Sequence, residues 1–250
     1  MAMLRILAAA AALAAMNATA DCTAHSGTHV RALVELYTSE GCSSCPPADR
    51  WLSRLAASGD PRVVPLAFHV SYWDYIGWKD RFASPLYTER QQDLAEAQGA
   101  ASVYTPQVMI GGRDFRRWSS EAAVNEALDA ITRTPAAASL ALTQEPLTAQ
   151  GIEGRASLEW LKARAGAGAR LYVALTQDGL ASHVTAGENK GEDLRHHAVI
   201  RDFALVGTRE GRFRFAARPD WDVARMSVVA FAQDPVTGRV VQALSAPLCR

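Results

Sequence analysis

The sequence lacks an excess of charge of either sign, and it lacks the common nucleotide and hydrolase motifs. Its 250 residues contain 26 basic side chains of Lys and Arg and 26 acidic side chains of Asp and Glu. No overall basic field would therefore attract nucleic acid or an anionic membrane surface. A Gly-rich phosphate loop, a GxSxG turn and an HExxH motif are absent from the sequence. Nucleotide and hydrolase chemistry thus have no support.

The apolar run at the start of the chain is too short to cross a bilayer as a helix, which takes about twenty residues. Residues 1–20 instead have the pattern of a signal peptide. Arg5 precedes an apolar run over residues 6–16, and Ala-Thr-Ala at residues 18–20 is a signal peptidase site. We predict cleavage after Ala20, a periplasmic or secreted location, and no membrane span in the mature protein.

Cysteine is scarce, with four residues in the whole chain. Disulfides persist in an exported protein because no reducing thiol pool removes them. Cys22 follows the predicted cleavage site closely and Cys249 is the penultimate residue, whereas Cys42 and Cys45 are near neighbours. Four cysteines allow three pairings. The proximity of Cys42 to Cys45 leads us to predict a structural disulfide between Cys22 and Cys249.

The two parts of the mature sequence differ in pattern. Residues 21–136 alternate apolar, strand-like segments with helical segments, which predicts an α/β domain whose mixed sheet is flanked by helices. Residues 137–250 contain short apolar segments separated by turn residues. This second pattern predicts a smaller, mostly antiparallel, β-rich domain of sandwich-like architecture.

A CxxC sequence separates the first predicted strand from the first predicted helix. The free N–H groups and the dipole at a helix start stabilise a thiolate, the form of cysteine that attacks a disulfide. On this scheme Cys42 is the nucleophile, and Cys45 resolves the mixed disulfide by attacking the Cys42 sulfur. Pro46 disfavours helical geometry at Cys45. Either the helix begins at Pro46, or Cys45 has an unusual conformation; a late start would offer Cys42 fewer N–H groups.

The order of strand, CxxC, helix, strand, helix and a Thr-Pro before a further strand resembles the thioredoxin superfamily, and VELYTSEGCSSC is similar to its glutaredoxin-type entrance. The resemblance implies that Pro106 is cis and lies against the CxxC, and that the Thr105 backbone pairs with an incoming peptide. It also implies a buried acid that moves the proton of the second thiol. Glu35 is the candidate for that role; the alternative is a strand-end carboxylate held in a hydrogen bond.

Four segments resemble, in order, the secreted bacterial family known as domain of unknown function 1223. They are VELYTSEGCSSCPPAD, HVSYWDYIGWKDRFASPLYTERQ, YTPQVMIGG and HVTAGENKGEDLRHHAVIR. That family is described as thioredoxin-like and has no settled activity. The resemblance therefore supports the fold and the export of this chain more than a particular reaction.

Aromatic residues follow the second predicted strand. Tyr72 and Trp73, with Tyr75 and Trp78 behind them, are candidates for an apolar platform that grips a substrate chain. The alternative is a loop that packs on the domain interface.

A polar segment interrupts the otherwise apolar second part of the chain. Its spacing matches no metal signature, and we expect a long hydrogen-bonded loop at the domain junction. Its members are His183, Glu188, Asn189, His196, His197 and Arg201.

Three functions remain open on the sequence. The first is an exported thiol-disulfide oxidoreductase or redox-active binding protein, with protein thiols or disulfides as clients and no bound cofactor. The second is a Cu(I)-binding protein of metallochaperone type, in which His69 or Met109 joins the two thiolates. The third is a non-catalytic module in which the CxxC is a structural disulfide and the β-rich domain recognises a partner.

Overall fold

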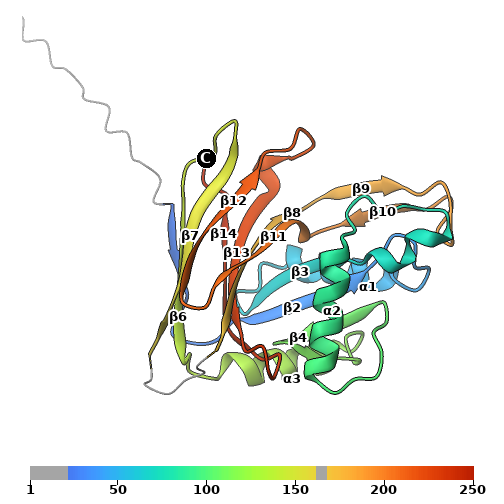
Figure 1. Cartoon of the computed structure of the whole chain (residues 1–250). Helices are drawn as coiled ribbons and strands as arrows, with labels where there is room; N and C mark the ends of the chain where they lie inside the picture. The colour runs from blue at the N-terminus through green and yellow to red at the C-terminus, as the bar shows by residue number, and fades with distance from the viewer. Residues whose placement is uncertain (1–21, 162–167) are drawn as a thin grey trace, which may run out of the picture.

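The computed structural model describes residues 22–161 and 168–250 (Figure 1). The predicted signal peptide, residues 1–20, lies outside these ranges. The helices in chain order are α1 (Pro46–Ala57), η1 (Ser71–Ile76), α2 (Pro85–Ala97), α3 (Glu121–Thr132) and η2 (Val223–Arg225), of which η1 and η2 are 3₁₀ helices. The strands are β1 (Thr23–His25), β2 (Ala32–Thr38), β3 (Val63–His69), β4 (Gln107–Ile110), β5 (Arg113–Asp114), β6 (Ala138–Gln144), β7 (Gly151–Trp160), β8 (Arg170–Gln177), β9 (Leu180–His183), β10 (Asp193–His196), β11 (Val199–Gly207), β12 (Glu210–Ala216), β13 (Met226–Gln233) and β14 (Val240–Pro247).

The architecture is mixed α/β, as expected from the sequence, and is dominated by one large mixed sheet. This sheet has eight strands in the order β14-β13-β8-β11-β3-β2-β4-β5. A second sheet has four strands in the order β1-β6-β7-β12, and β9 pairs with β10 in a separate hairpin.

Strand β2 lies inside the large sheet and has helices over both of its faces. All seven residues of β2 are buried, as expected of a strand that is covered on both sides. It runs parallel to β3 and antiparallel to β4. Helices α1 and α3 pack on one face through residues such as Leu52 and Leu128. Helix α2 packs on the opposite face through Tyr87 and Leu94.

Local sequence signals set the ends of α2 and α3. The Ser84 side chain accepts a hydrogen bond from the Leu86 N–H, and Pro85 occupies the first turn of α2. Ser120 caps α3 in the same manner. Gly99 follows α2 with a φ of 66°, a conformation that favours glycine.

Strand β11 joins the two parts of the chain into one sheet. It runs parallel to β3, with Val199 opposite Ala67, and antiparallel to β8. The four-stranded sheet lies over β8, β13 and β14, and apolar residues such as Leu140 and Phe215 fill the space between them. The boundary predicted near residue 136 therefore separates two sequence patterns, while the sheet itself continues across it.

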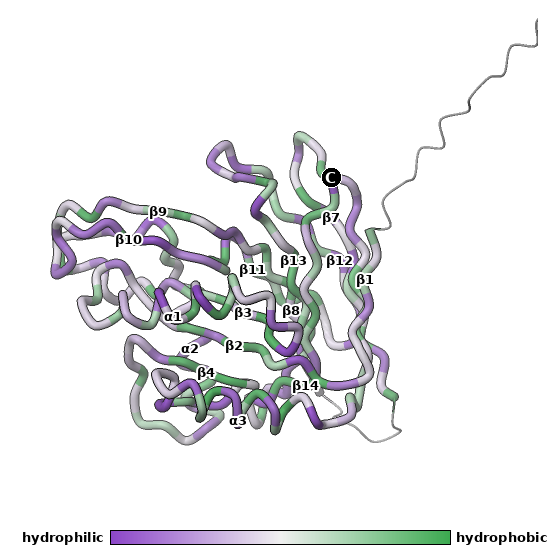
Figure 2. Tube along the Cα trace, turned by 180° about the vertical axis from the view of Figure 1, so that it is seen from behind, coloured by the Kyte–Doolittle hydropathy of each residue, from purple (hydrophilic) through white to green (hydrophobic). Residues whose placement is uncertain are grey.

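The β9–β10 hairpin, here called the arm, projects from the body of the protein alongside α1 (Figure 1). The sequence predicts a loop in this region, and the structure instead has two strands of four residues each. Figure 2 shows apolar residues along β2 and many polar residues along the arm. Among the residues that the structure describes, no helix has both the length and the apolar character needed to span a membrane.

Candidate functional site

The cysteine pair lies in the turn that leads from the end of β2 to Pro46 at the start of α1. Cys42 and Cys45 form a disulfide, with 5.4 Å between their Cα atoms. Only 1% of Cys42 and none of Cys45 is exposed, although Ser43 and Ser44 between them face solvent. The disulfide is therefore buried just beneath the exposed part of the turn.

Few backbone N–H groups of this turn remain free to interact with the Cys42 sulfur. The Cys45 N–H donates to the Cys42 carbonyl at 3.1 Å, and the Ser43 N–H donates to Glu188 Oε2 at 3.1 Å. Helix α1 begins at Pro46, and Cys45 before it has helical backbone angles, with φ −78° and ψ −36°. Because the first two residues of α1 are prolines without an N–H, Cys42 gains less from this helix start than from an ordinary one.

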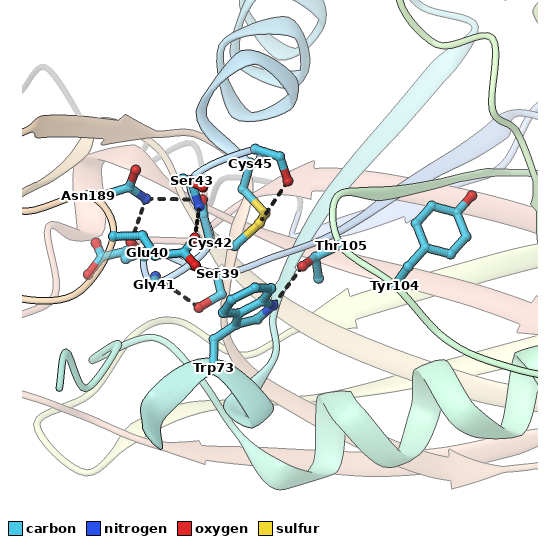
Figure 3. Close-up of a disulfide and its surroundings, with 12 residues drawn as sticks. Ser39, Glu40, Gly41, Cys42, Ser43, Cys45, Trp73, Tyr104, Thr105 and Asn189 are labelled. Atoms are coloured by element: carbon cyan, nitrogen blue, oxygen red, sulfur yellow. Dashed lines mark hydrogen bonds between the residues drawn. A yellow bond between two sulfur atoms is a disulfide. The ribbon is translucent and has the colours of Figure 1, made fainter. Parts of the chain in front are cut away.

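Trp73 and Thr105 lie beside the disulfide (Figure 3). The indole N–H of Trp73, in η1, donates to Thr105 Oγ1 at 2.7 Å. The peptide bond between Thr105 and Pro106 is cis, as the resemblance implied. Gly41 approaches η1 so closely that a Cβ there would lie 3.2 Å from the Trp73 Cβ. Trp73 and Thr105, two of the predicted substrate-binding residues, thus lie beside the cysteine turn, and Pro106 follows Thr105 in the chain.

Tyr72, the fourth predicted substrate-binding residue, holds the segment before β4. Its hydroxyl donates to Gln91 Oε1 at 3.3 Å, and the Gln91 amide donates to the Tyr104 carbonyl at 2.8 Å. Tyr72 and Trp73 are half-buried, whereas Tyr75 is 82% exposed. These contacts favour the interpretation that the aromatic segment packs against its neighbours, and a role in gripping substrate stays a prediction.

Glu35 lies on the face of the sheet that α2 covers, opposite the face that α1 covers. Its Oε1 is 2.6 Å from Arg90 Nη2, and both side chains are buried. The structure therefore places Glu35 in a buried ion pair. Four aromatic rings surround the Arg90 guanidinium with centroids 5.0 to 5.4 Å away, and these are Phe68, Tyr172, Phe203 and Phe231.

A group of buried titratable side chains lies behind the cysteine turn, and we call it the acid–histidine cluster. Its members are Glu40, Asp49, His69, Asp80 and His196, each of which is at most 7% exposed. His69 Nδ1 is 2.6 Å from Asp80 Oδ2, and His196 Nε2 is 3.2 Å from Glu40 Oε1. The Glu40 N–H donates to Asp80 Oδ2 at 2.9 Å. The two pairs are therefore linked to each other and to the cysteine turn.

Burial and charge act in opposite directions on the pKa values of this cluster. Burial lowers the pKa of His69, but the charge and hydrogen bond of Asp80 outweigh it, so the pKa lies above its ordinary value. Burial raises the pKa of Asp80, but His69 outweighs it, so the pKa lies below its ordinary value. For Asp49, burial is the strongest influence and raises its pKa. Asp49 is thus the carboxyl in this cluster whose surroundings favour the protonated form.

Sequence reasoning missed these acids, and only one of them had a local signal. Asp49 follows Cys45 by four positions in a predicted helix, and side chains with this spacing lie on the same helix face. Glu40 and Asp80 carry no such signal because their partners are distant in sequence. Glu40 meets His196 across 156 positions, and its backbone meets Asp80 across 40.

The tip of the arm contacts the cysteine turn directly (Figure 3). The Asn189 side-chain amide donates to the carbonyls of Glu40 and Cys42, at 2.8 and 3.0 Å. Glu188 accepts the hydrogen bond from the Ser43 N–H. The polar segment that we expected to form a hydrogen-bonded loop therefore supplies side chains to the candidate site.

The other polar residues of that segment have different partners. His183 is 2.8 Å from Asp193 in an exposed pair within the arm. Arg201 pairs with Asp220, and His197 is half-buried.

Met109 and His69, the residues considered as copper ligands, have other contacts in the structure. Met109 is fully buried in the core on the α2 face, and His69 is held by Asp80. Across residues 22–161 and 168–250, no group of three or more His, Cys, Asp or Glu side chains has an arrangement that could hold a metal ion.

Cys22 and Cys249 form the second disulfide, in agreement with the predicted pairing. Their Cα atoms are 5.6 Å apart, although 227 positions separate them in the sequence. The bond fastens the first described residue to the segment after β14 and lies apart from the cysteine turn.

The fold and the site together define a mixed α/β protein with a buried CxxC disulfide at the start of a helix, compatible with either a structural or a redox disulfide. The chain belongs to the family described as protein of unknown function DUF1223, which matches residues 33–233.

The solved structures that resemble this chain include two that match most of its length. A protein of Agrobacterium tumefaciens, determined by X-ray crystallography, has a TM-score of 0.65 and 28% identity over 89% of this chain and 96% of its own. HBP35 of Porphyromonas gingivalis has a TM-score of 0.65 and 13% identity over 89% of this chain and 76% of its own. The likeness to HBP35 concerns the fold alone. No curated protein matches the sequence.

Proposed function

We propose that this protein is an exported thiol-disulfide exchange protein of the thioredoxin superfamily, with Cys42 and Cys45 as the reacting pair. One observation carries the proposal: the disulfide lies between a buried parallel strand and the first turn of a twelve-residue helix, beside Trp73 and Thr105. The strand order β3-β2-β4-β5, with helices on both faces, supports the resemblance to that superfamily. The two disulfides support an oxidising compartment, and residues 1–20 would direct export to it.

The reaction needs two attacks by sulfur. In the reduced protein, the Cys42 thiolate attacks a client disulfide, and one client thiolate leaves and takes up a proton. The Cys45 thiolate then attacks the Cys42 sulfur, and the second client thiolate leaves and takes up a proton. Two electrons pass from the cysteine pair to the client, and the Cys42–Cys45 disulfide forms again.

Asp49 suits the transfer of the Cys45 proton better than Glu35 does. Glu35 is paired with Arg90 on the α2 face. Asp49 is buried in α1, one helical turn after Cys45, and burial raises its pKa. Its carboxylate would accept the proton that leaves the Cys45 thiol when that sulfur attacks.

The experiment equilibrates the mature chain with mixtures of reduced and oxidised glutathione, followed by alkylation and peptide mapping. We expect the Cys42–Cys45 pair to interconvert while the Cys22–Cys249 disulfide stays oxidised. Cys45→Ser should retain glutathione on Cys42 as a mixed disulfide, and Cys42→Ser should retain none. With dithiothreitol as the electron donor, the wild-type chain should speed the reduction of insulin disulfides, and Cys42→Ser should not.

A structural disulfide is the second candidate, because Cys42 is only 1% exposed. On this alternative, the CxxC bond ties the turn to α1 and takes no part in exchange. A Cys42–Cys45 bond that resists dithiothreitol in the folded protein, together with equal insulin reduction by wild type and Cys42→Ser, would establish this alternative and refute the first.

A further inference from the structure

The arm brings a negative charge to the cysteine turn from a distant part of the sequence. Glu188 lies 145 positions after Ser43, whose N–H it binds. We propose that Glu188 is a positioning residue that favours the disulfide form of Cys42 and Cys45 over the reduced form, and that Asn189 holds it against the turn. The inference deepens the proposed function and rests on it, because it concerns the same sulfur pair.

Asn189 fixes the backbone of the turn at Cys42 and just before it. Its amide donates to the Cys42 carbonyl and to the carbonyl of Glu40, two residues earlier. Asn189 is only 5% exposed, so these hydrogen bonds are sheltered from competing water. Loss of the amide would leave two carbonyls of the turn without this donor, which is costly for buried groups. Asn189 therefore keeps the neighbouring Glu188 in register with Ser43.

Packing also holds the tip of the arm in place. Gly187, before Glu188, has a φ of 74°, and a Cβ on it would lie 3.3 Å from atoms of Ile76 and Trp78. At the base of the arm, His196 reaches Glu40. The arm is thus held to the cysteine turn at its tip by Asn189 and at its base by His196, and Glu188 lies between Gly187 and Asn189 at the tip.

The Glu188 carboxylate acts on Cys42 in two ways. It occupies the Ser43 N–H, the first amide after Cys42, which then has less to offer a thiolate. It also repels a thiolate electrostatically, because both groups are negative. The Ser43 hydrogen bond lowers the pKa of Glu188, so this carboxylate is charged at neutral pH. The oxidised pair has no charge on Cys42 and feels no such repulsion.

The sign of the effect on the equilibrium follows directly. Reduction by two glutathione molecules breaks the Cys42–Cys45 bond, forms two thiols and yields one glutathione disulfide. Where Cys42 ionises, a carboxylate beside it raises the free energy of the reduced form only. The disulfide is therefore favoured, and the reduced pair is a stronger electron donor than it would be without Glu188.

Glu188→Gln tests the proposal, because the amide oxygen can still accept from Ser43 while the charge is lost. Other titratable groups around the turn are unchanged: the acid–histidine cluster, contributed by the cysteine turn, α1, β3, β10 and the segment after η1, and the exposed Lys190 on the arm. Glu192→Gln is the matched control, because Glu192 is an exposed acid of the same arm that lies next to β10, where its carbonyl accepts from the Val184 N–H.

The first measurement is the pH dependence of iodoacetamide alkylation of Cys42 in the reduced chain. We expect Glu188→Gln to lower the pH midpoint by about half a pH unit, equivalent to about threefold more thiolate, which is the order of magnitude for the loss of one nearby solvent-exposed charge. Above that midpoint, the glutathione equilibrium should shift about threefold towards the reduced pair. Both effects should shrink in high salt. Asn189→Ala should reproduce part of the shift by releasing Glu188.

The outcomes separate this proposal from the proposed function. Alkylation and glutathione equilibrium are measured on the chain alone, so an absence of insulin reduction leaves the test of Glu188 intact. Equal midpoints in wild type and Glu188→Gln, or equal shifts in Glu188→Gln and Glu192→Gln, would overturn the role of Glu188. A shift that is confined to Glu188→Gln and weakened by salt would establish it.

Discussion

Single residues decide the charge that is buried behind the cysteine turn. His69 and Asp80 form a close and buried ion pair. The pKa of His69 is raised and the pKa of Asp80 is lowered. A raised histidine pKa adds stability that is present below the ordinary value of about 6.5 and is lost as the pH rises through the folded value. A lowered aspartate pKa adds stability that is present above about 3.9 and is lost as the pH falls through the folded value. The ion pair therefore stabilises the fold most between about pH 4 and about pH 6.5.

His69→Gln should remove this pH-dependent stabilisation, because the amide can donate to Asp80 but carries no charge. We expect the free energy of unfolding to fall by about 1 to 2 kcal/mol at pH 5.5 and by less at pH 8.5. Urea unfolding at the two pH values measures the difference. His183→Gln is the control, since that histidine pairs with Asp193 in solvent and exposed pairs contribute little. A loss that is the same at both pH values would contradict the charge-based account.

Elements meet at turns where only glycine fits. The turn between β4 and β5 packs against the turn between β13 and β14, and Gly112 faces Gly238 there. A Cβ on Gly112 would lie 1.8 Å from the Gly238 carbonyl oxygen, and Gly112 has a φ of 80°. The Val240 N–H also donates to the Gly111 carbonyl at 3.1 Å. This contact fastens the hairpin beside α3 to the far end of the large sheet.

Gly112→Ala should destabilise the protein by about 3 kcal/mol, because a left-handed conformation and a backbone clash both oppose it. Gly59→Ala is the matched control. Gly59 has a φ of 65°, but a Cβ on it would meet no atom within 4 Å, so strain alone should cost about 1 kcal/mol. Thermal and urea unfolding of the two variants measure the gap. Equal losses of stability in the two variants would mean that the two turns move apart enough to relieve the clash.

At the scale of the whole molecule, Arg90 links helix α2 to both parts of the large sheet. It pairs with Glu35 of β2 and lies among rings from β3, β8, β11 and β13. The first two of these four strands lie on different sides of residue 136, where the sequence pattern changes. The buried Arg90 charge therefore has partners in both parts of the sheet. Separation of the two parts would remove some of these partners and would be unfavourable.

Arg90→Met should lower the free energy of unfolding by about 3 to 5 kcal/mol, because Glu35 would stay buried without its cation. Arg90→Met with Glu35→Gln should recover a large share of that loss, since the second change removes the stranded charge. Urea unfolding of the single and double variants provides the comparison. A double variant no more stable than Arg90→Met would show that ring packing around Arg90, and not the charge, is what matters.

Features that rest on neighbouring residues were predictable, and features that rest on distant contacts were not. The cap at Ser84 and the position of the CxxC follow from local rules, and the structure has both. The start of α1 at Pro46 is one of the two alternatives that local rules left open for Cys45. The pairing of Cys22 with Cys249 followed from counting cysteines. The pairing of Val199 with Ala67 and the contact of Glu188 with Ser43 join residues more than a hundred positions apart, and a single sequence provides no register for them.

The candidate site shows the same division. The apolar residues on both faces of β2 predict that Glu35 is buried, but only the packing of α2 against its face reveals Arg90 as its partner. The acid–histidine cluster collects side chains from five separate segments, and none of these segments has a local pattern that indicates the others. Periodicity within one helix offered a single clue, the spacing of Asp49 from Cys45.

The arm also has a consequence for the order of events during synthesis. The chain is synthesised from its N-terminus, so Asn189 is added 147 residues after Cys42. The cysteine turn is therefore synthesised long before the tip of the arm that contacts it. During that interval the turn lacks the hydrogen bonds that Glu188 and Asn189 make to it in the folded protein.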